Sequence, residues 1–123
     1  MRVWTVDEAR AALPRVRAVV ERIRELVEAA RARSAPGSAK PSTNGHGAVR
    51  EPGDRELHEC SEELHREGIV LRDPERGLLD FPAVAPSGRP YWICWLAGES
   101  DIGWWHWPED GFAGRRPLTD PPD

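Results

Sequence analysis

The sequence has little cysteine, no long apolar run and no excess of positive charge. Its two cysteines, Cys60 and Cys94, are too few for a disulfide framework, which favours free thiols in a reducing compartment. No apolar stretch approaches the roughly 20 residues that cross a bilayer, and no secretory signal is recognisable. Seventeen basic and twenty-one acidic side chains interleave to a net charge of −4, which offers no footprint for nucleic acid or anionic lipid. We therefore expect a cytoplasmic protein that binds neither nucleic acid nor membrane.

Tryptophan, by contrast, is abundant. Five of the six tryptophans lie between Trp92 and Trp107. Indole side chains have a flat apolar face and one N–H donor, so such a cluster either fills the core of a small domain or stacks on a ligand or a second protomer. The length of 123 residues fits a single domain, 1–123.

The first third of the chain predicts a long amphipathic helix over residues 5–33. Thr5 and Glu8 have the spacing of a capping box, in which each side chain accepts a hydrogen bond from the other residue's amide. Pro14 predicts a kink, or a separate short helix before it. Apolar residues then recur every three or four positions, as on one helix face: Val16, Val19, Val20, Ile23, Leu26, Val27 and Ala30.

Residues 34–53 have no periodicity and are rich in serine, glycine and proline, which predicts a flexible linker. A second helix is predicted over 54–67, with Asp54 as N-cap and Gly68 after its end. Its apolar stripe is Leu57, Cys60 and Leu64. Two amphipathic helices joined by a linker are expected to pack as an antiparallel hairpin.

Residues 68–113 change to a strand-like pattern, and residues 114–123 form a polar, proline-rich tail that little holds in place. Strands are expected at 69–71, 78–81, 91–96 and 101–107, with a loop over 82–90. The predicted fold is α+β, with the antiparallel two-helix hairpin packed on a small antiparallel sheet of three or four strands.

Several segments of this region are distinctive in combination: GIVLRDPERGLLDFPA (68–83), ICWLAGE (93–99) and IGWWHWPEDGFAGRRPL (102–118). Together with the opening TVDEARAALPRVR, their order resembles an uncharacterised bacterial family catalogued as domain of unknown function 2203. The resemblance implies an intact domain and assigns no reaction. The motif positions it marks here are Asp73, Gly77, Asp80, Phe81, Cys94, Trp95, Gly98, Glu99, Trp105, His106, Gly111, Phe112, Gly114 and Arg115.

The first candidate site lies on the second predicted helix. His58, Glu62 and His65 are spaced by four and three residues, so they share one helix face and could bind zinc or iron. That face lies about 115° from the apolar stripe, which argues against a buried di-iron centre between helices. A mononuclear site at its margin and an ordinary solvated face both remain open.

The second candidate site lies in the last hairpin and contains Cys94, Glu99 and His106. If the loop between its strands holds five residues, Cys94 pairs with Trp104 and His106 lies diagonally on the same face, within joint reach of a metal or ligand. A register shift of one residue separates them. An adjacent imidazolium would lower the pKa of the thiol and activate it. The alternative is that Cys94 is a small core hydrophobe.

Charged residues around this hairpin complete the set of candidates. Asp80 sits unusually between two apolar strand residues, and Arg115 is the expected partner for it or for an anionic ligand. Asp73 is expected to cap the turn that precedes residue 78. The candidate ligand-binding residues are Trp95, Glu99, Trp105 and Arg115.

Three functions remain open at this point. The leading one is a non-catalytic module that binds a small ligand or a transition metal such as zinc or iron, or assembles as a homodimer, through this hairpin. The second is a small enzyme with His106 as acid–base group and Cys94 or Asp80 as partner. The absence of a phosphate loop or nucleophile elbow disfavours the enzyme. The third is a structural accessory protein.

Overall fold

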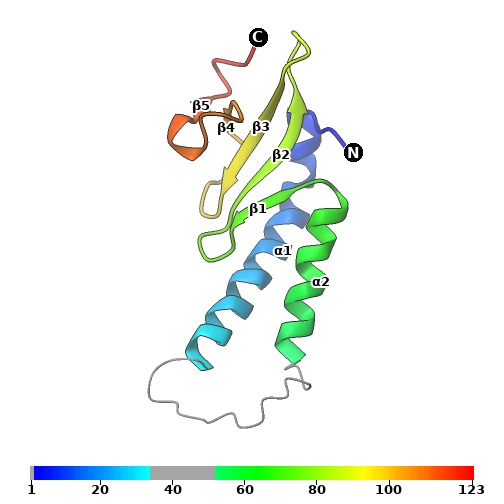
Figure 1. The fold of residues 1–123 in the computed structure, drawn as a ribbon, viewed down its shortest axis with the longest axis vertical. Helices are drawn as coiled ribbons and strands as arrows, with labels where there is room; N and C mark the ends of the chain where they lie inside the picture. The colour runs from blue at the N-terminus through cyan, green and yellow to red at the C-terminus, as the bar shows by residue number, and fades with distance from the viewer. Residues whose placement is uncertain (1, 34–51) are drawn as a thin grey trace.

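A computed structural model describes residues 2–33 and 52–123 (Figure 1). These residues form two helices and one antiparallel sheet, so the predicted α+β class is confirmed. The sheet has five strands in the order β1-β2-β3-β4-β5, so the expected number of three or four is too low. The elements are α1 (Val6–Arg33), α2 (Pro52–Arg66), β1 (Val70–Asp73), β2 (Leu78–Val84), β3 (Pro90–Leu96), β4 (Trp104–His106), the 3-10 helix η1 (Phe112–Gly114) and β5 (Arg116–Pro117).

Helix α1 begins with the predicted capping box. The Glu8 amide donates to Thr5 Oγ1 and the Thr5 amide donates to Glu8 Oε1, each at 3.0 Å. Pro14 lies inside one continuous helix, so a separate short helix before it is wrong. Pro14 is exposed. Water can therefore bond to the backbone carbonyl that the missing proline N–H leaves free.

Helices α1 and α2 lie side by side and run in opposite directions (Figure 1). Arg22 pairs with Glu56 at 2.6 Å and Arg15 pairs with Glu67 at 2.6 Å. These exposed ion pairs each contribute little to stability, so buried apolar side chains such as Leu64 carry the packing. The linker predicted over 34–53 falls mostly outside the described residues.

Helix α2 begins two residues earlier than expected, at Pro52. Proline is favourable in the first turn because its missing N–H would have had no helical partner there. Asp54 is therefore an acidic residue of the first turn, and its prediction as N-cap is wrong.

One face of the sheet packs against the helices. Because side chains alternate along a strand, every second residue of β2, β3 and β4 joins the core that α1 covers. The sheet contributes Leu79, Phe81, Ile93, Trp95 and Trp105, and α1 contributes Val16, Val20 and Ile23. The residues between them point to the opposite face.

The turn between β1 and β2 lies directly against α1. Gly77 has a φ of 72°, and a Cβ placed on it would lie 2.6 Å from Ala97 Cβ and 3.1 Å from Val20 Cγ1. Its carbonyl accepts a hydrogen bond from the Ala97 amide at 3.0 Å. This turn therefore needs glycine both for its conformation and for its close packing.

Strand β2 is longer than predicted and runs through Pro82 to Val84, so the expected loop over 82–90 is wrong at both ends. The Pro82 carbonyl accepts a hydrogen bond from the Trp4 amide at 2.7 Å. The pairing of β2 with β1 ends at Val70 and Asp80, so β1 offers no partner for a Pro82 N–H on that side. The missing N–H of Pro82 therefore costs the sheet no hydrogen bond.

The C-terminal segment is held in place, contrary to the loose tail expected over 114–123. Arg116 pairs with Trp105 in the β4–β5 ladder. The Leu118 amide donates to the Gly103 carbonyl at 3.0 Å, and Trp105 Nε1 donates to the Asp120 carbonyl at 2.9 Å. Backbone groups, one indole N–H and the packing of Leu118 against the core supply this attachment, so the mostly polar composition of the segment does not reveal it.

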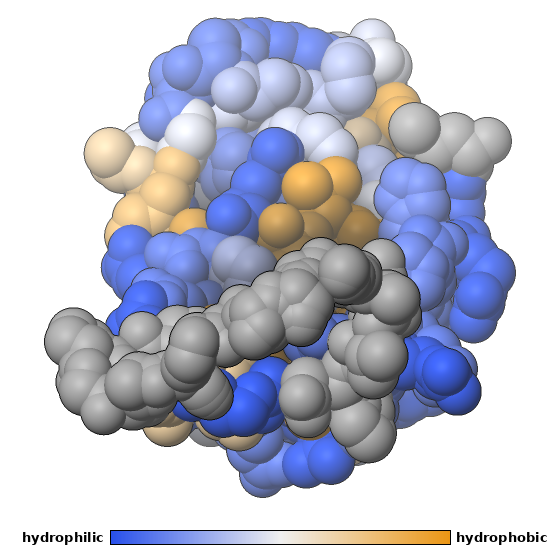
Figure 2. Space-filling model, turned by 60° about the horizontal axis from the view of Figure 1, so that its bottom comes forward, coloured by the Kyte–Doolittle hydropathy of each residue, from blue (hydrophilic) through white to orange (hydrophobic). Residues whose placement is uncertain are grey.

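Figure 2 shows the face that includes the lower ends of the helices, which is mostly hydrophilic with small apolar patches. The large hydrophobic side chains that are exposed among the described residues are Val3, Val84, Trp104 and Phe112. The last two both lie against the Arg115 guanidinium. In the described part of the chain, neither helix is both long and apolar enough to cross a membrane.

Candidate functional site

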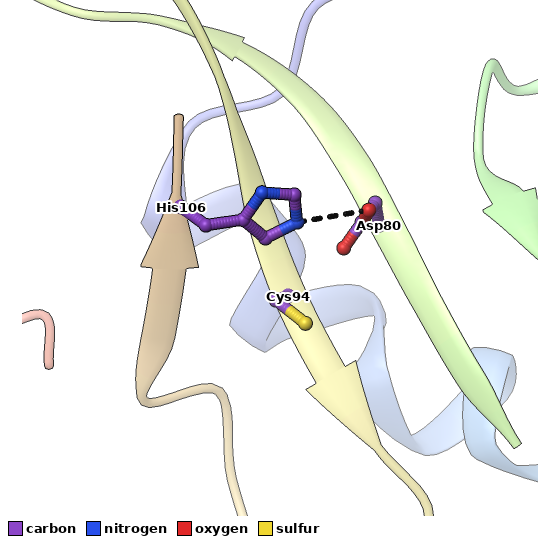
Figure 3. A group of neighbouring side chains, drawn as sticks. All are labelled: Asp80, Cys94 and His106. Atoms are coloured by element: carbon purple, nitrogen blue, oxygen red, sulfur yellow. Dashed lines mark hydrogen bonds and ion pairs between the residues drawn. The ribbon is translucent and has the colours of Figure 1, made fainter. Parts of the chain in front are cut away.

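Three neighbouring strands each contribute one polar side chain to the sheet face opposite the helices (Figure 3). Asp80 on β2 pairs with Cys94 on β3, and His106 on β4 lies diagonally beyond. Their ligating atoms all lie within 4.8 Å of one another. The residues are 2%, 1% and 3% exposed, respectively. Among the residues that the structure describes, no other three histidine, cysteine or acidic side chains come together in this way.

The register of β3 and β4 explains why Cys94 and His106 lie close together. Cys94 pairs with Trp104, and Trp92 pairs with His106. This is the register predicted from a five-residue loop, and it places Cys94 and His106 on one face. The expectation that the two side chains share a surface is therefore confirmed.

Hydrogen bonds fix the His106 ring in one orientation. Nδ1 lies 2.9 Å from the Trp107 carbonyl oxygen, and Nε2 lies 3.1 Å from Asp80 Oδ2. A carbonyl oxygen only accepts, so Nδ1 carries a proton. In a neutral ring Nε2 would then turn its lone pair toward a carboxylate oxygen. Two acceptors at this distance need a cation between them, either a proton or a metal ion.

The two oxygens of the Asp80 carboxylate differ in their hydrogen bonding. Oδ2 faces His106 and also accepts from Arg72 Nε at 2.9 Å, whereas Oδ1 is buried and has no hydrogen-bond partner. Burial acts to raise the Asp80 pKa, but the hydrogen bonds from His106 and Arg72 outweigh it and the pKa is lowered. The group is thus a carboxylate at neutral pH.

The His106 pKa shifts in the complementary direction. Burial acts to lower it, but the hydrogen bonds to Asp80 and to the Trp107 carbonyl outweigh burial and raise the pKa above its ordinary value. In the protein without a metal ion, a proton therefore occupies the space between Nε2 and the carboxylate, and the two groups form a buried ion pair.

Cys94 behaves differently from the sequence-based expectation. Burial, reinforced by the negative charge of Asp80, raises the pKa of its thiol to about 12. The prediction that His106 would lower this pKa is wrong because the carboxylate lies beside the sulfur as well. Cys94 is therefore a neutral thiol at pH 7 and a poor nucleophile. Binding of a metal ion in place of the proton would convert it to a thiolate ligand.

A cavity of about 300 Å³ opens in front of the three side chains. Its remaining wall comes from β1, the start of β2 and the segment after β4: Arg72, Leu78, Pro108, Gly111 and Phe112. A small molecule in this cavity would reach all three polar groups.

Glu99 and Arg115 are placed elsewhere. Glu99 Oε1 accepts from the Leu96 amide at 2.9 Å and from Arg115 Nη2 at 2.8 Å. Asp80 thus takes the place that was expected for Glu99 beside Cys94. The predicted pairing of Arg115 with Asp80 is wrong, since Arg72 is the arginine that Asp80 binds.

The other predicted residues do not reach the cavity. Trp95 and Trp105 lie on the helix-facing side, in the core. On α2, His58 and His65 are exposed, and Glu62 and His65 line an open groove of about 800 Å³ beside β1. Asp73 Oδ1 caps its turn by accepting from the amides of Glu75 and Arg76, as expected.

Arg72 is the site residue that the sequence reasoning missed. It lies where the β1–β2 register shifts, between Leu71 and Asp73, and it reaches Asp80 across the hairpin. A signal was available, because a hairpin over the turn before Leu78 brings Arg72 and Asp80 onto one ribbon.

The chain was compared with protein families, curated proteins and solved structures. The family described as "Uncharacterized conserved protein (DUF2203)" matches residues 2–118. No curated protein and no solved structure matches the chain.

Proposed function

The chain belongs to the family of uncharacterized conserved proteins DUF2203, and we propose that it binds a transition metal ion, zinc above all, through Asp80, Cys94 and His106. The set comprises one oxygen, one sulfur and one nitrogen ligand. Zinc accepts all three at bond lengths of about 2.0–2.3 Å, which set ligand atoms about 3.5 Å apart. The observed separations of up to 4.8 Å need only small side-chain movements to reach that geometry.

The observation that carries this proposal is the arrangement of Asp80 and His106. The Trp107 carbonyl keeps the proton on Nδ1, so Nε2 is the nitrogen left for a cation, and it faces a carboxylate. Metal-bound histidines are oriented in this way, with the second ring nitrogen donating to a carbonyl or carboxylate. The partnerless Asp80 Oδ1 provides a further acceptor in the same place.

Stability alone does not account for this cluster. Buried ion pairs are often no more stabilising than apolar side chains of similar volume, because both charges lose their hydration. Here a carboxylate, an imidazole and a thiol occupy three neighbouring positions of the sheet. Apolar side chains of similar volume could fill these positions without lowering the stability of the fold. A binding role is a reason for such residues to be there.

Cobalt substitution tests the proposal directly. Metal-free protein titrated with Co²⁺ should develop a sulfur-to-cobalt charge-transfer band, and Zn²⁺ should displace the cobalt. Cys94→Ser should abolish the band and weaken Zn²⁺ binding by about 100-fold or more, because losing a direct ligand exceeds the 10–100-fold cost of losing an outer partner.

The chain contains a matched control in Cys60, the second free cysteine, which lies on α2. Cys60→Ser should leave the band and the affinity for Zn²⁺ unchanged within about threefold. A further control, His58→Ala, tests the rival site on α2. No charge-transfer band in the unmodified protein, or loss of the band in Cys60→Ser alone, would refute a metal site at Cys94.

The alternative of a small enzyme has weaker support. His106 is 3% exposed, and both of its ring nitrogens are already engaged, Nδ1 by the Trp107 carbonyl and Nε2 by Asp80. The Cys94 thiol, with a pKa of about 12, is not activated for attack. Assembly as a homodimer stays a prediction, to be checked by measuring mass in solution at several concentrations.

A further inference from the structure

The cavity leaves room for a fourth ligand on the proposed metal ion. Zinc in proteins is usually four-coordinate, and sites with three protein ligands hold water or another small ligand in the fourth position. Asp80, Cys94 and His106 all line the same cavity of about 300 Å³. The fourth position would therefore face this space, which sets the size of what can bind there.

Arg72 lines this cavity and has hydrogen-bonding capacity to spare. Its Nε donates to Asp80 Oδ2, and its guanidinium lies 4.8 Å from the Trp92 ring centre, which fixes its plane. Within the described part of the chain, its two Nη groups make no hydrogen bond. The side chain is 42% exposed, so these donors are accessible. A guanidinium with free N–H groups recognises planar oxyanions.

The charges around the cavity favour a single negative charge. A divalent ion bound by the Asp80 carboxylate and the Cys94 thiolate is neutralised, and Arg72 then leaves the site with an excess of one positive charge. Two further arginines lie near Phe112, but Arg115 is already paired with Glu99 and Arg76 with Asp73. A carboxylate balances the excess, whereas a phosphate dianion would reverse it.

The rest of the cavity wall is apolar. Leu78 faces it from the start of β2, and Pro108 and Phe112 face it from the segment after β4. These side chains suit a hydrocarbon portion next to the charged group, and the volume lies at the lower end of the range for small-molecule sites.

We propose that the cavity binds a small organic carboxylate, held between the metal ion and the Arg72 guanidinium. This inference rests on the proposed metal binding. The carboxylate occupies the fourth coordination position through one oxygen, and the Nη groups of Arg72 donate to the other.

Acetate and its neutral isostere acetamide are suitable probes. Acetate added to the Co²⁺-loaded protein should change the visible cobalt spectrum in a saturable way, and acetamide should not. At saturating cobalt, Arg72→Gln should weaken acetate binding by about 10-fold, the loss expected for one charge-assisted hydrogen-bonded contact. Arg76→Gln is the matched control, because Arg76 is near Phe112 but does not line the cavity. It should change acetate binding by less than about twofold.

The outcomes separate the two proposals. If cobalt fails to bind, the metal site itself is refuted. If cobalt binds and acetate leaves its spectrum unchanged, only the carboxylate proposal falls. Inorganic phosphate binding more tightly than acetate would overturn the assignment of ligand class. An equal response to acetate and acetamide in the unmodified protein would overturn the role of charge, without reliance on any variant.

Discussion

Replacing Asp80 with alanine should lower the free energy of unfolding of the metal-free protein by about 3 kcal/mol. The carboxylate is 2% exposed and is the only partner of His106 Nε2 among the described residues. Its removal leaves an imidazolium buried without a counter-charge and opens a small cavity. Breaking a buried ion pair in this way costs about 3–5 kcal/mol, and the lower end applies because imidazole can release its proton. Urea denaturation with a chelator present measures the change.

A double-mutant cycle shows whether the pair itself is responsible. His106→Leu added to Asp80→Ala removes the stranded charge, so the double variant should be more stable than the sum of the two single effects predicts. The expected coupling is about 1 kcal/mol or more. Additive effects would show that Asp80 and His106 do not interact as an ion pair, and would weaken the case for a shared cation.

Gly77→Ala should destabilise the protein by about 2–5 kcal/mol. The residue has a φ of 72°, a conformation that costs an L-residue about 1–2 kcal/mol. The new methyl group would also lie 2.6 Å from Ala97 Cβ, a contact between two groups with no freedom to rotate away. Overpacking of this kind adds about 1–3 kcal/mol. The change would push the β1–β2 turn away from Ala97 and from α1.

Gly88 provides the comparison. It also has a positive φ, 92°, but a Cβ there meets nothing within 4 Å. Gly88→Ala should therefore show only the conformational cost, about 1–2 kcal/mol. Thermal or urea unfolding of both variants measures the difference. Equal losses in the two variants would mean that the close packing of Gly77 against Ala97 and α1 adds nothing to the cost.

The elements that local pattern determines were predictable from the sequence. The capping box at Thr5 and Glu8 and the apolar stripe that follows predict the start and the buried face of α1, and both are observed. The sequence leaves the register of the last hairpin open between two alternatives, and the observed one, with Cys94 opposite Trp104, is the one that a five-residue loop implies. These features depend on residues close together in the chain, so nearby residue types suffice to identify them.

The features that were missed depend on contacts between distant segments. Pro82 can continue β2 because it lies beyond the last pair with β1, on the side where Trp4, far away in the sequence, donates to its carbonyl. The polar C-terminal segment is held by backbone groups around Gly103 and by the Trp105 indole. Asp80 is a different case: Arg115 was expected as its arginine partner, although the nearby β1–β2 hairpin brings Arg72, eight residues away, beside it.

The order of the sheet strands, which is also their order in the chain, bears on how the protein assembles. Asp80 on β2 and His106 on β4 are 26 residues apart. The chain between them forms β3, which pairs with both of these strands. The loops that join β2 to β3 and β3 to β4 are short, so closing them costs little chain entropy. The three strands can therefore pair one after another. During synthesis α1 leaves the ribosome well before strands β2, β3 and β4. Its row of valines and isoleucine therefore stays uncovered until the tryptophan-rich half of the chain arrives, which makes that interval the one most exposed to aggregation.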